Sequence, residues 1–331
     1  MNTWGSDPRL KPTPDYGSLG PGSDLQPGSK PTPLGPQQVR LRAFSAALVG
    51  LLVGLVVVAA NGTVARAAWQ QISDYLSLHG KPEPASPAVM SQHEIQGLDN
   101  SSPQAQAELL LERAINHYDG ANDEIAERVD HWRGKIKLNA RLNPLFTTAL
   151  NSNDLRVRAA AIEIDLAAYN IAKTPESVER FAQQAGASDK RTRVWGLWML
   201  GLLANRGVEP ERANEILVSH LQDPDPDIRM WAVEGLSYLG TDNTIAPLLK
   251  TFHDDSSPAV RERAACGLAQ SGMLSQEQRR SAIPQLLDFL DDSSLEANTR
   301  EWVYHALRDI TGQNLPNDPA AWRNWYNAST R

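Results

Sequence analysis

The chain has 331 residues, enough for two ordinary domains or for one domain with tails, and its single cysteine, Cys266, excludes a disulfide framework and a four-cysteine zinc site. Residues 105–331 hold 25 basic and 32 acidic side chains, so the whole net charge of −7 lies in this part of the chain. Because a nucleic-acid-binding domain needs a basic face to neutralise phosphates, this composition argues against nucleic acid as a partner.

Residues 1–42 are expected to form a disordered tail. Residues 1–39 contain eight prolines and six glycines and no apolar run. Proline removes backbone donors and glycine raises the entropy cost of ordering, so this segment cannot build a core. The tetrapeptide Lys-Pro-Thr-Pro occurs at 11–14 and again at 30–33, which suits a docking or phosphorylation tail and equally suits a solvated leader.

Residues 43–65 predict one transmembrane helix. They form a run of 23 residues without a charge, and at ~1.5 Å per residue a helix of that length spans about 34 Å, enough for a hydrocarbon layer of about 30 Å. A cleaved signal peptide is the alternative, since residues 65–67 resemble an A-x-A cleavage site. The long leader and the length of the apolar run favour an uncleaved anchor.

The charges that flank this segment predict its orientation. Five basic residues precede it, whereas Arg66 and Lys81 are the basic residues that follow closely. The positive-inside rule therefore places the N-terminus in the cytoplasm and residues 66–331 on the exoplasmic or periplasmic side.

Small residues lie along one face of the predicted membrane helix, at Ala46, Gly50 and Gly54. Such a face allows close approach of two backbones, and it would permit a homodimer through this helix. The alternative is that glycine and alanine are simply frequent in membrane spans.

Residues 66–104 predict a continuation of this helix and then a linker. Four prolines fall between residues 80 and 103, where almost no apolar periodicity is present. Residues 105–331 predict a domain of repeated helices.

An internal repeat organises that domain. Five segments align on an arginine, at spacings of 35, 36, 32 and 39 residues: Arg158, Arg193, Arg229, Arg261 and Arg300. In four of them an acidic residue lies four positions earlier, where it can cap a helix, and in four a leucine lies seven positions later; Asp165 takes the place of that leucine in the first. Another amphipathic stretch precedes each segment, so the repeat unit is predicted to be two antiparallel helices. We expect the aligned arginines to be structural and to bridge to acids or carbonyls of the neighbouring unit.

The two central units carry a recognisable motif. It reads Asp-Pro-Asp-Ile-Arg at 225–229, followed by Ala232, Leu236, Leu239 and Gly240, and Ser-Pro-x-Val-Arg at 257–261, followed by Ala264 and Leu268. This pattern resembles HEAT repeats, especially the short bacterial HEAT-like repeats that also occur in phycobilin lyases. The resemblance covers about residues 140–312 and implies an all-α fold, an α-solenoid of HEAT-like antiparallel helix pairs. Residues 318–325, with two tryptophans, predict a short capping helix.

Catalytic chemistry is not evident in the sequence. None of the seven histidines belongs to an H-E-x-x-H motif or a close His/Cys cluster, and no G-x-S-x-G is present. Deoxyhypusine hydroxylases, which have HEAT-like repeats, hold iron with His-Glu pairs, but the adjacent pair here, His93-Glu94, lies in the predicted linker. We expect no cofactor, no metal and a non-catalytic function. A phycobilin-lyase-like enzyme or chromophore-handling protein is the alternative, on analogy of fold.

A strip of aromatic and basic residues is the predicted binding site. Two positions after the aligned arginine, or five positions in the case of Trp198, the units present Trp195, Trp198, Trp231, Arg263 and Trp302. Positions on the second helices stack along the concave face of a solenoid, and Trp198 is expected to point most directly away from the core. Because tryptophan and arginine dominate interface energetics, we predict that a protein partner binds here. The alternative is that the indoles two positions after the arginine wedge between neighbouring repeats.

Overall fold

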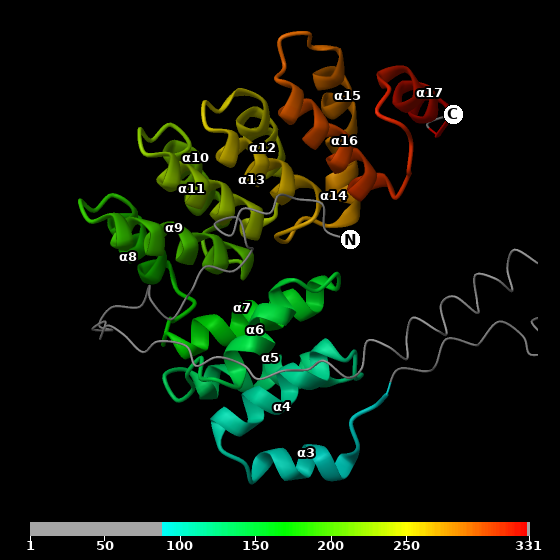
Figure 1. Cartoon of the computed structure of the whole chain (residues 1–331). Helices are drawn as coiled ribbons and strands as arrows, with labels where there is room; N and C mark the ends of the chain where they lie inside the picture. Colours follow the sequence, from blue (N-terminus) through cyan, green and yellow to red (C-terminus); the bar gives the residue numbers. More distant parts are fainter. Residues whose placement is uncertain (1–87, 330–331) are drawn as a thin grey trace, which may run out of the picture. The chain divides into compact units, whose positions relative to one another are not determined.

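The computed structural model describes residues 88–329, in which the chain forms the helices α3–α17 and no β-sheet (Figure 1). None of these helices is long and apolar enough to cross a membrane. The predicted tail, the predicted span at 43–65 and its small-residue face of Ala46, Gly50 and Gly54 lie outside the described residues.

Three helices precede the repeats: α3 (Gln92–Asp99), α4 (Pro103–Ile115) and α5 (Ala121–Trp132). Residues 92–99, which belong to the segment 66–104 expected to contain a linker, form α3. The side chain of Ser91 accepts a hydrogen bond from the backbone N–H of Glu94 at 3.2 Å, and the carboxylate of Glu94 accepts one from the N–H of Ser91 at 3.1 Å. This reciprocal cap satisfies two free amides, and burial of Leu98 holds the helix against its neighbours.

The repeats are five pairs of helices in sequence. They are α6 (Leu142–Leu150) with α7 (Leu155–Ala168), α8 (Pro175–Ala185) with α9 (Lys190–Asn205), α10 (Pro210–His220) with α11 (Pro226–Leu239), α12 (Asp242–Asp254) with α13 (Pro258–Ala269), and α15 (Ile283–Asp291) with α16 (Ala297–Thr311). A short helix, α14 (Gln276–Ser281), precedes the last pair. The prediction of an all-α solenoid is confirmed.

The second helices of three pairs begin at an aspartate. Asp154, Asp189 and Asp225 accept hydrogen bonds from the backbone N–H groups of Arg156, Thr192 and Asp227 at 2.9, 2.8 and 2.9 Å. Each bond satisfies an amide that has no partner inside the helix, which is why an acid recurs four residues before the aligned arginine.

The second helices pack closely on one another along the stack. Helices α9, α11, α13 and α16 contact in succession, whereas the first helices α8, α10 and α12 touch each other little. Glycine permits the closest approach, since a Cβ on Gly201 would lie 2.5 Å from the carbonyl oxygen of Gly235 on the next unit. Within a pair, a Cβ on Gly196 would lie 2.6 Å from the backbone nitrogen of Ala185. The small residue three positions after Arg193 thus lets the two helices of a pair meet.

The helix expected after the last repeat is α17 (Pro319–Ser329), which packs against α15. Trp322 is fully buried, and its indole N–H donates to the carbonyl oxygen of Pro316 at 3.0 Å. The ring of Trp325 meets it edge-on at 6.0 Å between centroids. These two indoles cover apolar surface that another repeat would otherwise bury.

Candidate functional site

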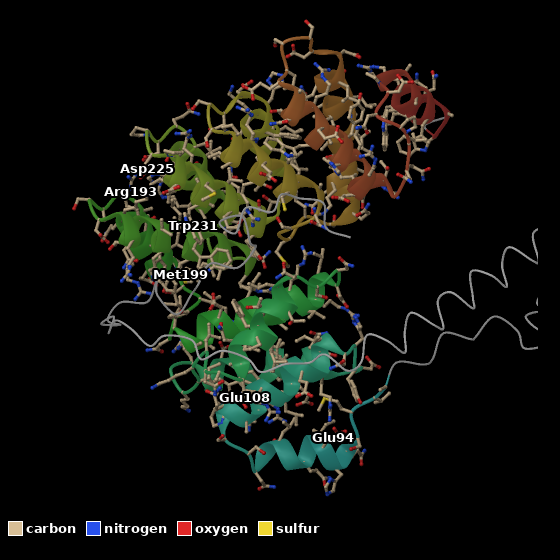
Figure 2. The ribbon with its side chains drawn as sticks, viewed as in Figure 1. Glu94, Glu108, Arg193, Met199, Asp225 and Trp231 are labelled. Atoms are coloured by element: carbon tan, nitrogen blue, oxygen red, sulfur yellow. The ribbon has the colours of Figure 1, made fainter. Side chains whose placement is uncertain are left out.

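Three of the aligned arginines connect one repeat to the next. Arg229 donates two hydrogen bonds, both of 2.8 Å, to the carboxylate of Asp255, which lies just before α13. Arg261 donates to the hydroxyl of Thr299 on α16 at 3.0 Å and pairs with Glu296. Arg193 pairs in the same way with Asp223, which lies near the start of α11. Figure 2 shows Arg193 close to Asp225, the first residue before that helix.

The first and last aligned arginines differ from these three. Arg300 donates to the carbonyl oxygens of Leu290 and Asp292 within its own unit, at 2.5 and 2.6 Å. Arg158 donates to Gln270 at 3.0 Å and to Gly272, both in the turn after α13. The same residue type in the same register therefore has three kinds of partner.

Replacing Arg229 by alanine is expected to lower the free energy of unfolding by about 1–3 kcal/mol, because the buried carboxylate of Asp255 loses both hydrogen bonds. Urea unfolding followed by circular dichroism measures the change. Arg191→Ala is the matched control, since Arg191 is an exposed arginine on α9 and should be neutral. Equal stability of the two variants would contradict a structural role for Arg229.

The predicted binding strip is not an exposed row. Trp198 is 0 % exposed, and its ring meets those of Trp231 and Tyr238 edge-on, at 6.1 and 4.8 Å between centroids. Its indole N–H donates to the carboxylate of Asp165 on α7 at 3.3 Å. The expectation that Trp198 points away from the core is therefore wrong, because α7 and α11 cover that side of α9.

Two further residues of the strip are buried as well. Trp195 packs edge-on against Tyr169 at 4.6 Å between ring centroids. Arg263 forms an ion pair with the buried Glu234 of α11. Burial would lower the pKa of Arg263, but the charge of Glu234 outweighs this effect and raises it. Trp231, on α11 (Figure 2), and Trp302, on α16, are half-buried, so these two residues retain surface that a partner could touch.

Asp165 is a buried carboxyl that the strip hypothesis did not include. It is 0 % exposed, and within the described residues its Oδ1 atom has no hydrogen-bond partner. Burial raises the pKa of Asp165 to about 7, against the opposing effect of the hydrogen bond from Trp198. Burial, together with the charge of Asp165, also raises the pKa of Tyr169 to about 12. The sequence signal for Asp165 is its position seven residues after Arg158, where the other four repeats have a leucine.

Helix α7 covers part of the row of second helices. Arg158, near its beginning, contacts the turn after α13, while Asp165, near its end, contacts Trp198 on α9. Tyr169, just after α7, contacts Trp195 on α9. The repeat pattern suggested an open groove along the second helices. In the structure, helix α7 of the first repeat occupies this side of α9.

Metal chemistry has no evident ligand set in this part of the chain. Among residues 88–329, no group of three or more histidine, cysteine, aspartate or glutamate side chains is placed to hold a metal ion. The pair His93-Glu94 lies in α3.

The comparison with protein families agrees with the helix pairs. Residues 178–269 match the family model of HEAT repeats. This match spans most of α8 and continues to the end of α13, so it includes both central units whose motif resembles HEAT repeats, and it confirms that resemblance. A designed armadillo repeat protein in complex with the peptide (KR)4 is similar in structure, with 17% sequence identity, coverage of 67% of this chain and 95% of that chain, and a TM-score of 0.28. No curated protein matched the sequence.

Proposed function

We propose that the chain is a non-catalytic scaffold that is anchored to a membrane and binds a protein partner through its repeat domain. The observation that carries this proposal is the stack of HEAT-type helix pairs, a construction that presents extended surface and is used for binding. A phycobilin-lyase-like function shares this repeat, but no observation in residues 88–329 favours it over a scaffold.

The membrane part of the proposal rests on the sequence of residues 43–65 and on the basic residues before them. With the N-terminus in the cytoplasm, the repeat domain would act on the exoplasmic or periplasmic side. A homodimer through Ala46, Gly50 and Gly54 would then place two repeat domains side by side at the membrane.

The partner-binding part of the proposal now rests on Trp231 and Trp302. Both indoles are half-buried, so each is held by packing and still offers an apolar edge. The buried Trp198 supports Trp231, whose ring it meets edge-on at 6.1 Å between centroids, while Trp195 and Arg263 are buried elsewhere in the second helices. Residues of this kind, an aromatic anchor over a well-packed base, are typical of binding hot spots.

Site-specific photo-cross-linking in membranes tests this assignment. A photoreactive residue in place of Trp302 in the full chain should give a discrete cross-linked protein, whereas the same residue in place of Glu215, an exposed position on α10, should not. Trp231→Ala should lower the yield from position 302 about tenfold or more, as expected for loss of an anchor worth ~2 kcal/mol. Equal cross-linking from positions 302 and 215 would contradict this binding surface.

A further inference from the structure

Two buried arginines from distant parts of the chain line the same cavity. Arg158 on α7 is 4 % exposed, and Arg279 on α14 is 5 % exposed. The cavity has a volume of about 430 Å³ and is also lined by Asn153, Gln270 and Asp309. It lies where α7 meets the turn between α13 and α14.

Neutral carbonyl oxygens hold both guanidinium groups in place. Arg158 donates to Ser152, Gln270 and Gly272. Arg279 donates to Leu268 at 3.0 Å, Gln270 at 3.3 Å, Ser271 at 2.8 Å and Leu274 at 2.9 Å. The two side chains thus share the carbonyl of Gln270. Neither forms an ion pair within residues 88–329, so their positions are fixed while their charges are not neutralised.

The surroundings of this pair favour additional negative charge. Burial lowers the pKa of Arg158, and burial together with the charge of Arg158 lowers the pKa of Arg279 to about 10. Asp309 opposes this effect for Arg279. Its side chain is exposed, so water weakens the effect of its charge without removing it. Buried charges in proteins are normally paired, and here two of like sign lie together.

The two guanidinium groups have N–H donors that the carbonyls do not use. A guanidinium has five N–H donors; the carbonyls take three bonds from Arg158 and four from Arg279, which leaves three N–H groups between them. Asn153 lines the same space. Planar, fixed guanidinium groups match the oxygens of phosphate better than a flexible ammonium group does.

We propose that this cavity binds a small oxyanion between Arg158 and Arg279, either free phosphate or sulfate or the phosphoryl group of a small phosphate monoester. The bound anion would neutralise both guanidinium groups. It would also join α7 to the turn after α13, and so fasten the first repeat to the fourth. An anion that binds the native state alone stabilises it in proportion to its occupancy.

The experiment is thermal unfolding and calorimetric titration of the full chain in detergent, at pH 7 and constant ionic strength set with chloride. The probes are inorganic phosphate, sulfate and glycerol 3-phosphate. A saturable rise in the unfolding temperature is expected with phosphate. Tighter binding of glycerol 3-phosphate than of phosphate would identify a phosphorylated small molecule as the source, and the reverse order would identify the free anion.

Arg279→Gln is expected to weaken phosphate binding at least tenfold. Arg280→Gln is the matched control, because the neighbouring Arg280 is exposed and its replacement changes the net charge equally. The proposal would be overturned if none of phosphate, sulfate and glycerol 3-phosphate bound saturably. It would also be overturned if the Arg279→Gln and Arg280→Gln variants bound phosphate with equal affinity.

Asp309→Asn provides a test that leaves both guanidinium groups in place, for the case in which Arg279→Gln does not fold. Removing this carboxylate from the cavity lining makes the site more positive, so phosphate should bind about three- to tenfold more tightly. An unchanged affinity would show that the cavity is not an anion site.

Discussion

Replacing Trp198 by alanine is expected to lower the free energy of unfolding of the repeat domain by about 3–5 kcal/mol, the usual cost of removing a buried tryptophan. The indole is 0 % exposed and packs edge-on against Trp231 and Tyr238. Its removal leaves a cavity between α9 and α11, and the carboxyl of Asp165 loses a hydrogen bond. Urea unfolding of the full chain in detergent, followed by tryptophan fluorescence and circular dichroism, measures the change.

Two further variants separate the causes of this loss. Trp198→Phe retains a ring but removes the N–H donor, so it should cost less than Trp198→Ala. Trp302→Ala removes an indole that is only half-buried and should also cost less. A Trp198→Ala protein within about 0.5 kcal/mol of the wild type would mean that the indole is a surface residue, as the repeat pattern alone suggests.

The helix pairs could be predicted because their signals are local. An acid that caps a helix, a small residue three positions after the arginine and a leucine seven positions after it all act within one repeat. The helix α3 was missed although its cap, Ser91 with Glu94, is a local signal too. It lies among prolines and glycines, and this composition is typical of a linker even where a capping pattern is present.

The exposure of Trp198 could not be predicted in this way. The pattern places a residue on a face of its own helix, but it does not show which other segment covers that face. Here the covering segment is α7, which contacts both α9 and the turn after α13, and Arg158 and Gln270 are 112 residues apart in the sequence. The partners of the aligned arginines also depend on other units: Arg193, Arg229 and Arg261 pair with acids of the next unit, whereas Arg158 donates to the turn after α13.

Replacing Asp165 by asparagine is expected to stabilise the protein increasingly as the pH rises. In the folded chain the carboxyl titrates at about 7, whereas its ordinary pKa is 3.8. Because the folded pKa is raised, the stability that this group contributes is complete below its unfolded pKa and declines as the pH rises toward its folded pKa. Above that pH the ionised carboxylate remains buried, and its effect on stability is constant. At ~1.4 kcal/mol per pKa unit, the full loss is about 4 kcal/mol.

Asparagine keeps the shape of the protonated acid and an oxygen that can accept from Trp198, but it cannot ionise. The free-energy advantage of Asp165→Asn over the wild type should therefore grow by about 3 kcal/mol between pH 5 and pH 8 in urea unfolding. Tyr169 does not titrate in this range, because its pKa is about 12. Asp123→Asn, an exposed acid on α5, should show no such trend. Parallel pH profiles for Asp165→Asn and the wild type would mean that Asp165 is hydrated in solution. In that case α7 would not exclude water from the face of α9 that carries Trp198.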